Sequence, residues 1–210
     1  MTTPRYGNNL DVSGVVLAGG QSRRLGRDKA LEPLGGQPLI RRVIQRVAEV
    51  SSEIIVVVAD QKMGDTLPLE TASRLTLDLY PGKGSLGGIY SGIAAAVADW
   101  SFVVACDMPF LNPTLLSYML SLRGTADAVV PLVEGRLEPT HGLYSKACLP
   151  YIEERLIAKD LKISRFLDQV RVNYLREEEI SMIDPQHLSF FNVNTAEDLG
   201  MARAMVAQGW

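Results

Sequence analysis

The sequence lacks the features of a secreted, disulfide-rich or membrane-spanning protein. Its two cysteines, Cys106 and Cys148, lie far apart and form neither a CxxC pair nor a metal-ligand spacing. We interpret them as small buried residues of a reduced, cytoplasmic protein. No apolar run is long enough to span a bilayer. The polar segment 1–14 lacks the apolar core of a signal peptide, so we expect neither export nor a membrane partner.

The chain also lacks an excess of basic residues. Its formal net charge is −3 and it has no long basic run, which argues against a general nucleic-acid surface. Against this background, four cations gather at residues 23–29, directly after an apolar run that ends on Gly19 and Gly20. Cations repel one another and glycine costs backbone entropy. We therefore expect this turn to bind an anion that carries several charges.

Strand-like runs alternate with helical patterns in the first half of the chain. The expected strands are residues 11–18, 53–59, 74–79 and 101–108, and the expected helices are residues 38–50, 85–100 and 112–123. This order is typical of an α/β, doubly wound (Rossmann-like) fold, with one mostly parallel sheet and helices on both faces. We expect a single domain over residues 1–210, with residues 1–11 as a flexible N-terminal tail.

The second half of the chain is less regular. Its pattern indicates two strands within residues 126–145 around Glu134 and Gly135, helices at 146–158 and 162–170, a strand at 170–175, and a final helix that begins near Thr195. We expect Ser85, Asn112 and Thr195 to be helix N-caps. His141 lies in an apolar strand and is interpreted as a satisfied core residue rather than a catalyst.

The strand ends carry the candidate functional residues. Ligands of doubly wound sheets bind outside the carboxyl ends of the strands, so residues 19–29, 78–88 and 107–109 should share one rim. The first segment fits neither the dinucleotide nor the P-loop spacing, but its backbone N–H groups, with Arg23 and Lys29, can bind phosphates. Asp107 is a natural ligand for Mg²⁺. The alternatives are an ordinary turn beside a solvated basic face and a cap or turn aspartate.

The sequence offers no order of serine, histidine and acid, or of cysteine and histidine, that suggests a protein nucleophile. This absence argues against hydrolase chemistry. It favours a reaction in which positioning and charge neutralisation suffice, as in nucleotidyl transfer. A phosphate-binding turn opposite a Mg²⁺ carboxylate predicts a nucleoside triphosphate site.

Five stretches resemble, in order, the sequence blocks of the molybdenum cofactor guanylyltransferases, which are nucleotidyltransferases: LAGGQSRRLGRDKAL, PLGGQPL, PGKGSLGGI, ACDMP and FFNVNTAEDL. The resemblance extends from Val15 to about Ala202. It implies the nucleotidyltransferase type of α/β fold, and transfer of GMP from GTP to the terminal phosphate of molybdopterin or its molybdenum form. Pyrophosphate is released and Mg²⁺ is required. The LAGG form points to GTP, because relatives that use CTP usually read LAAG.

The resemblance also implies roles for individual residues. Those expected at GTP are Leu17, Ala18, Gly19, Lys29, Asp78 and Asp107. Those expected to be catalytic are Arg23, Lys29 and Asp107, with Asp107 also the metal ligand. By the same resemblance, Asn192 and Asn194 are expected to meet the pterin phosphate or to complete the metal shell. Arg165 is expected at the acceptor because it also lies in the irregular second half of the chain; the alternative is that it only covers a helix face.

Other functions stay open on the sequence alone. A related nucleotidyltransferase could use CTP on the pterin, or a nucleoside triphosphate on a sugar or polyol phosphate. A nucleotide-binding module without catalysis is a further alternative, although it need not have kept Lys29 and Asp107. The expected partners are GTP, molybdopterin or its molybdenum form, and proteins of molybdenum cofactor biosynthesis or molybdoenzyme maturation.

Overall fold

The computed structural model describes residues 11–19, 29–68 and 73–210. Its main sheet contains β1 (Ser13–Leu17), β4 (Glu53–Val58), β5 (Ser73–Leu77), β6 (Trp100–Ala105), β7 (Ala128–Val133), β8 (Arg136–Leu137), β9 (His141–Ser145) and β10 (Val172–Leu175). A separate hairpin joins β2 (Pro33–Leu34) to β3 (Gln37–Pro38). The predicted N-terminal tail lies largely outside the described residues, so it stays a prediction, as does the single domain.

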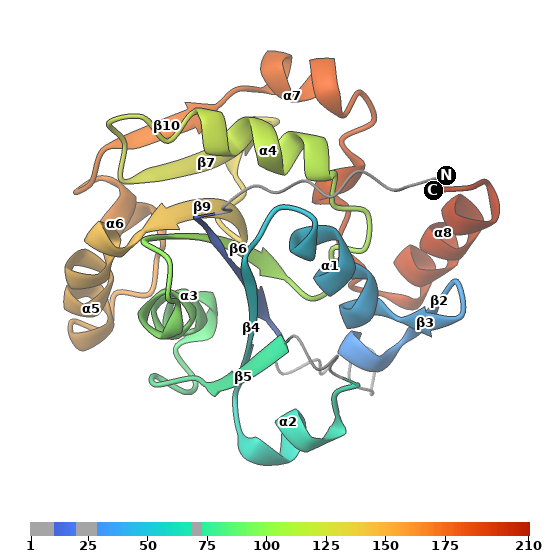
Figure 1. Cartoon of the computed structure of the whole chain (residues 1–210), viewed down its shortest axis with the longest axis horizontal. Coiled ribbons are helices and arrows are strands. Elements are labelled where there is room, and N and C mark those ends of the chain that lie inside the picture. Colours follow the sequence, from blue (N-terminus) through green and yellow to red (C-terminus); the bar gives the residue numbers. More distant parts are fainter. Residues whose placement is uncertain (1–10, 20–28, 69–72) are drawn as a thin grey trace.

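The helices surround this sheet (Figure 1). They are α1 (Leu39–Ala48), α2 (Gln61–Thr66), α3 (Gly84–Ala95), α4 (Pro113–Ser121), α5 (Leu149–Ile157), α6 (Ser164–Leu167), α7 (Glu177–Ile183) and α8 (Ala196–Ala207). The described residues also form three short 3-10 helices: η1 (Lys29–Leu31), η2 (Lys146–Cys148) and η3 (Leu188–Phe190). Among the helices of the described ranges, none combines the length and the apolar character needed to cross a membrane.

The sheet confirms the predicted mostly parallel core. Its strands follow the order β10-β7-β9-β6-β1-β4-β5, and β8 pairs with β7. β5, β4, β1 and β6 are parallel neighbours, whereas β9 runs antiparallel to both β6 and β7. The reversal starts at the predicted turn, where Glu134 and Gly135 both adopt positive φ values, 50° and 73°. Residues 126–145 therefore form three strands, one more than expected.

The apolar strands are covered on both faces, as their continuous β-branched runs predict. Val16, Val56 and Val104 point into a core on one face, and their neighbours point into a second core on the other face. α1 and α4 cover the first face, and α3 and α5 cover the second (Figure 1). Because helices cover both faces of the sheet, the place left for a ligand is the rim formed by the carboxyl ends of its strands.

α3 packs unusually close to the sheet. A β-carbon at Gly92 would lie 2.2 Å from Val15 Cγ1, and one at Gly88 would lie 3.1 Å from Leu17 Cδ2. Glycine at these positions lets the helix approach β1 and brings its first turn to the strand ends. A β-carbon at Gly92 would require Val15 or the helix to shift, whereas one at Gly88 would require only a small adjustment of Leu17.

Two expectations for α3 are wrong. Ser85 is not its N-cap, since the helix begins at Gly84 and the cap residue, Lys83, makes no side-chain cap bond. The helix ends at Ala95 and not at Trp100, which instead begins β6. The other two predicted caps are confirmed. Asn112 Oδ1 accepts a hydrogen bond from Thr114 N at 2.9 Å, and Thr195 Oγ1 accepts one from Asp198 N at 3.1 Å.

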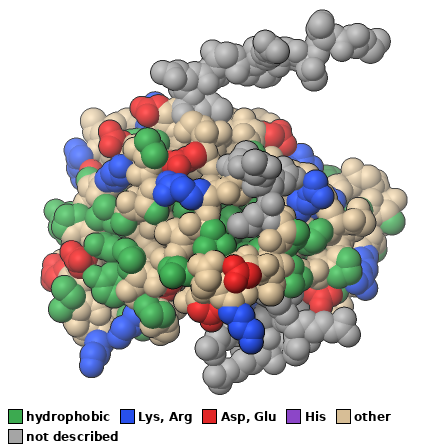
Figure 2. All heavy atoms as spheres, turned by 60° about the horizontal axis from the view of Figure 1, so that its bottom comes forward, with side chains coloured by type: hydrophobic (Ala, Val, Ile, Leu, Met, Phe, Trp, Pro, Cys, Tyr) green, Lys and Arg blue, Asp and Glu red, His purple; other side chains and the backbone are tan. Residues whose placement is uncertain are grey.

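Charges of both signs are interspersed over the face that Figure 2 turns toward the reader. Outside the grey atoms, Lys and Arg side chains stand singly or in small groups among acidic and apolar ones on this face. This distribution matches the formal net charge of −3 of the whole chain.

Candidate active site

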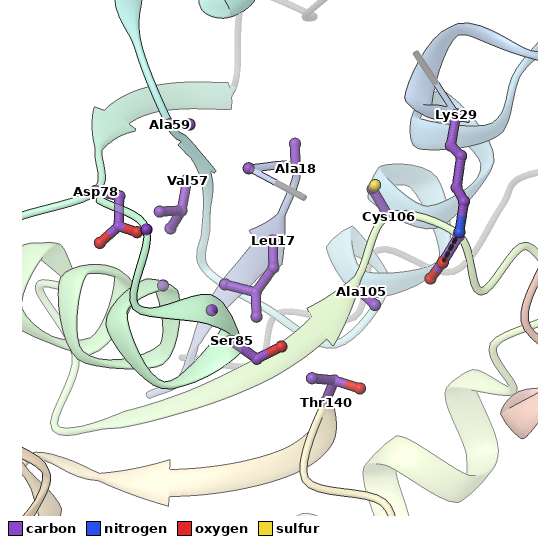
Figure 3. Close-up of a pocket in the computed structure, with 15 residues that line it drawn as sticks. Leu17, Ala18, Lys29, Val57, Ala59, Asp78, Ser85, Ala105, Cys106 and Thr140 are labelled. Carbon is purple, nitrogen blue, oxygen red and sulfur yellow. Dashed lines mark hydrogen bonds and ion pairs between the residues drawn. The ribbon is translucent and has the colours of Figure 1, made fainter. Parts of the chain in front are cut away.

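A pocket of about 510 Å³ lies at the carboxyl ends of the central strands (Figure 3). Its volume is in the range of small-molecule sites. All three segments predicted to share a rim contribute to it. The lining residues are Leu17, Ala18, Gly19, Lys29, Val57, Ala59, Asp78, Gly82, Gly84, Ser85, Gly88, Ala105, Cys106, Asp107 and Thr140.

One end of the pocket holds a cation between two oxygen groups. Lys29 Nζ lies 3.3 Å from Asp107 Oδ2 and 2.6 Å from Asn194 Oδ1. The Lys29 and Asp107 side chains are 17% and 16% exposed, so the pair is partly buried and still in contact with solvent. Val193 N donates to Asp107 O at 2.9 Å and ties the segment before α8 to the end of β6. Three segments far apart in sequence thus build this end.

The second oxygen of Asp107 has no partner. Asp107 Oδ1 is buried, and among the described residues nothing donates a hydrogen bond to it. A buried carboxylate oxygen without a partner costs free energy unless a cation or donor reaches it. The described part of the chain has no group of three His, Cys, Asp or Glu side chains that could hold a metal. A magnesium ion here would need oxygens of a bound phosphate, which is how Mg²⁺ is commonly held.

The other end of the pocket combines apolar walls with a second carboxylate. In Figure 3, Asp78, Val57 and Ala59 stand on the opposite side of Leu17 from Lys29. Asp78 Oδ1 accepts hydrogen bonds from Tyr80 N at 3.0 Å and from Ser91 Oγ at 2.8 Å. The apolar walls suit a base and ribose, and the Lys29 end suits phosphates. The pocket is therefore polarised in the manner expected for a nucleotide site.

Glycines shape the walls between these two ends. Gly82 and Gly84 adopt φ values of +79° and +63°, a region that disfavours residues with a β-carbon. Gly19 has a different constraint, because a β-carbon there would lie 3.2 Å from Ala59 N. A methyl group at this position would press on the end of β4 and would not simply fill open space.

The predicted acceptor residues do not come together in the described structure. Asn194 contacts Lys29, whereas Asn192 Nδ2 donates to Phe190 O at 3.0 Å. Arg165 is exposed on α6 and is not one of the lining residues. Arg23 lies outside the described residues. The acceptor roles and the catalytic role of Arg23 stay predictions.

Five lining residues were not predicted from the sequence: Val57, Ala59, Ala105, Cys106 and Thr140. Cys106 was interpreted as buried, but it lines the pocket and is only partly buried. The interpretation holds for Cys148, which is fully buried and whose thiol pKa is raised to about 12 by burial. Thr140 reaches the pocket because β9 runs antiparallel to β6, so the residue before β9 lies at the carboxyl end of β6. Its sequence context alone carried no such signal.

His141 is a core residue, as expected. Its side chain is fully buried, and its ring centroid lies 4.7 Å from that of Phe190. Within the described ranges neither ring nitrogen has a hydrogen bond of ordinary geometry, and the backbone of Ser189 is the polar group that acts on the ring. Burial lowers the pKa of His141 to about 4, so the ring is neutral at pH 7.

Comparisons with known proteins find similar sequences and a similar structure over most of the chain. Residues 14–174 match the MobA-like NTP transferase domain family. A Pelotomaculum thermopropionicum protein named "Probable molybdenum cofactor guanylyltransferase" is 41% identical over 93% of this chain and 94% of its own length. A Desulfosudis oleivorans protein named "Molybdenum cofactor guanylyltransferase" is 34% identical over 94% of this chain and 97% of its own.

A solved structure is similar over nearly the same extent. It is the molybdopterin-guanine dinucleotide biosynthesis protein A of Archaeoglobus fulgidus, with a TM-score of 0.82 and 28% identity. The match covers 93% of this chain and 99% of that protein. The family match, the relatives and the structural neighbour thus each cover most of this chain.

Proposed function

Because this chain belongs to the MobA-like NTP transferase domain family, we propose that its pocket transfers GMP from GTP to molybdopterin or its molybdenum form. The relatives named as molybdenum cofactor guanylyltransferases support this choice of substrates. The observation that carries it in the structure is the polarity of the pocket, with Lys29 and Asp107 at one end and apolar walls with Asp78 at the other.

The reaction needs no protein nucleophile. An oxygen of the terminal pterin phosphate attacks the α-phosphorus of GTP, and the bond from that phosphorus to the bridging oxygen of the β-phosphate breaks. The electron pair leaves with pyrophosphate. The protein aligns the two substrates and offsets the charge on the leaving group. Lys29, held 3.3 Å from Asp107, supplies a fixed positive charge for this task, and Arg23 is proposed to add a second.

Asp107 is the proposed ligand of Mg²⁺. Its Oδ1 atom is buried and unpaired within the described residues, and a hard cation prefers such an oxygen. The ion, when bound, neutralises phosphate charge and orients the triphosphate. Asp78, an acceptor-only group, is proposed to receive a donor of the nucleoside. Leu17, Ala18 and Gly19 are proposed to line the base and ribose.

Asn194 and Asn192 are proposed to meet the acceptor, with Arg165 as an additional contact. Asn194 has the stronger structural support, because it touches Lys29 at the phosphate end. The proposed location is the cytoplasm. Proteins of cofactor biosynthesis or molybdoenzyme maturation are proposed as partners.

The test is release of pyrophosphate by the purified protein with Mg²⁺, molybdopterin and each of GTP, CTP, ATP and UTP. We expect GTP to be the preferred substrate. Lys29→Ala should lower turnover with GTP by about 10²-fold or more, the scale for loss of a preorganised charge. Lys62→Ala is the matched control, because Lys62 is exposed on α2 and lines no part of the pocket.

Binding can be tested separately by thermal unfolding. Mg²⁺ and GTP at about 100 times Kd should stabilise the wild type by about 2.7 kcal/mol, which is about 5–10 °C for a chain of this size. Neither stabilisation nor pyrophosphate release with GTP would contradict the proposal. Release with CTP instead would identify a cytidylyltransferase.

A further inference from the structure

A buried serine controls the carboxylate at the nucleoside end of the pocket. Ser91 lies on α3 and is only 1% exposed. Its Oγ lies 2.8 Å from Asp78 Oδ1 and accepts a hydrogen bond from Leu79 N at 2.9 Å. We infer that Ser91 is a positioning residue for nucleotide recognition, which holds Asp78 so that its other oxygen is left for the nucleoside. This inference rests on the proposed function and deepens it.

The hydroxyl proton of Ser91 has two acceptors within reach. They are Asp78 Oδ1 and Gly87 O, each 2.8 Å from Oγ. A carboxylate is the stronger acceptor, because hydrogen bonds to an ionised group are shorter and stronger than neutral ones. Leu79 N–H occupies a lone pair of the same hydroxyl and so limits its rotation. The proton is therefore directed at Asp78.

The Asp78 carboxylate is held from several directions. Besides Ser91, the N–H of Tyr80 donates to Oδ1 at 3.0 Å, and Asp78 N donates to Val58 O at 2.8 Å. α3 closes the remaining side, because a β-carbon at Gly87 would lie 3.2 Å from both carboxylate oxygens. Oδ1 is thus engaged twice, whereas no described residue donates to Oδ2.

The turn that carries Asp78 has an independent anchor. The hydroxyls of Tyr80 and Tyr90 donate to the same Glu153 oxygen at 3.0 and 3.1 Å. The two rings also meet edge to face, with centroids 5.2 Å apart. Loss of the Ser91 hydroxyl should therefore release the carboxylate without releasing the whole turn.

The chemistry of Asp78 limits where this effect can appear. An ionised carboxylate accepts hydrogen bonds and does not donate them, so the groups of the proposed nucleoside that suit it are an N–H of the base and an O–H of the ribose. Phosphates carry negative charge and are repelled by it. A defect at Ser91 should consequently weaken recognition of the nucleoside and spare that of the polyphosphate.

The experiment compares Ser91→Ala with Ser101→Ala. Ser101 is an equally buried serine on β6 whose hydroxyl has no partner among the described residues, so it controls for loss of a buried hydroxyl. Binding of Mg²⁺–GTP and of inorganic tripolyphosphate is measured, together with kcat/KM for GTP. We expect Ser91→Ala to weaken GTP binding and kcat/KM about tenfold, as for loss of a charged hydrogen bond. Tripolyphosphate binding should change less than about twofold, as should all values for Ser101→Ala.

A double-mutant cycle separates positioning from a structural role. In the Asp78→Ala background, Ser91→Ala should lower kcat/KM by less than about twofold, because the group it positions is gone. Ser91→Cys, which keeps a weak donor, should fall between wild type and Ser91→Ala and serves if the alanine variant folds poorly. Equal losses in both backgrounds, or a parallel loss of tripolyphosphate binding, would overturn the inference. Failure of the wild type to use GTP would instead contradict the proposed function.

Discussion

Replacing Asp107 by alanine should separate catalysis from stability. Its Oδ2 pairs with Lys29 at 3.3 Å, and an ion pair that remains in contact with solvent contributes about 1 kcal/mol or less. Its Oδ1 is buried without a described partner, and such an atom costs about 1–3 kcal/mol. The two contributions oppose each other. Because the cost of the unpaired oxygen equals or exceeds the gain from the ion pair, we expect Asp107→Ala to leave the free energy of unfolding unchanged or slightly higher.

The same substitution should be severe for activity. If Asp107 holds Mg²⁺ at the triphosphate, its loss removes a preorganised electrostatic group, which typically costs about 10²–10³-fold in turnover. Stabilisation of the protein by Mg²⁺–GTP should fall with it. The assay is thermal unfolding of the protein without ligands, followed by pyrophosphate release at saturating Mg²⁺.

Asp127 offers a matched control with the opposite signature. Its side chain is also 16% exposed, but both of its oxygens are engaged by Arg171. They accept from Arg171 N, Nε and Nη2 at 3.0, 2.9 and 2.7 Å, and these bonds hold the Asp127 pKa below its ordinary value. Asp127→Ala should cost about 1–2 kcal/mol, or about 2–8 °C in melting temperature, and leave turnover nearly unchanged.

The comparison can refute the metal-site assignment. If Asp107 were a structural residue, its alanine variant would melt lower, as expected for Asp127→Ala, and would still transfer GMP. That result would show that the buried Oδ1 atom is unrelated to a cation. An equal loss of activity in both variants would show instead that the control is not neutral, and that the pocket responds to the stability of the fold.

Three further predictions concern the base, the acceptor and pH. GTP should be preferred over CTP by about 1–3 kcal/mol of transition-state free energy, measured as the ratio of the two kcat/KM values. Gly19→Ala should reduce this preference, because its methyl would press on Ala59 N at 3.2 Å. Equal turnover with both nucleotides would refute this. Asn194→Ala should lower turnover more than Asn192→Ala, since only Asn194 contacts Lys29, and steady-state kinetics at varied acceptor concentration test the order. Burial lowers the pKa of His141 from 6.5 to about 4, so the unfolded chain binds a proton in this window and the folded one does not. The free energy of unfolding should therefore fall by about 3 kcal/mol in total as the pH is lowered from 6.5 to 4, because of His141. His141→Leu should make urea unfolding less dependent on pH. An unchanged pH dependence would contradict this.

The sheet was predictable where burial alone decides the structure. The β-branched run of β4 is buried on both faces, and a continuous apolar run has few other folded environments. α1 was equally clear, because apolar residues at helical spacing predict one buried face, and the structure buries five of them: Leu39, Ile40, Val43, Ile44 and Val47. In these elements the local pattern and the tertiary packing favour the same conformation.

The errors occur where tertiary contacts decide. The alanine-rich end of α3 has high helix propensity, but Val97 N donates to Glu53 Oε1 and Ala98 N donates to Ser13 Oγ at 3.3 Å. These contacts draw the chain out of the helix after Ala95. α7 was missed for the opposite reason, because it buries only Ile180 and so presents no apolar periodicity. A hydrogen bond of 2.8 Å from Tyr118 to Glu179 fastens it to α4.

The site was predictable as a set of strand ends but not as a set of contacts. Parallel strands place their carboxyl ends on one rim, so the general positions of Gly19, Asp78 and Asp107 follow from the order of elements. The pairing of Lys29 with Asn194, which are 165 residues apart, does not follow from any local pattern. The position of Thr140 also requires β9 to run antiparallel, and the sequence does not reveal that direction.

The contact between Lys29 and Asn194 depends on α8, a helix that contributes no residue to the described lining of the pocket. Asp198 Oδ2, in the first turn of α8, accepts hydrogen bonds from Asn194 N at 2.9 Å and Thr195 N at 2.7 Å. α8 packs on the β2–β3 hairpin through a small core that includes Leu34, Val193 and Leu199. That hairpin follows η1, which carries Lys29. Both partners of the contact are therefore positioned by one apolar cluster. Docking of α8 sets the spacing at the phosphate end of the pocket, although the helix itself contributes no lining residue.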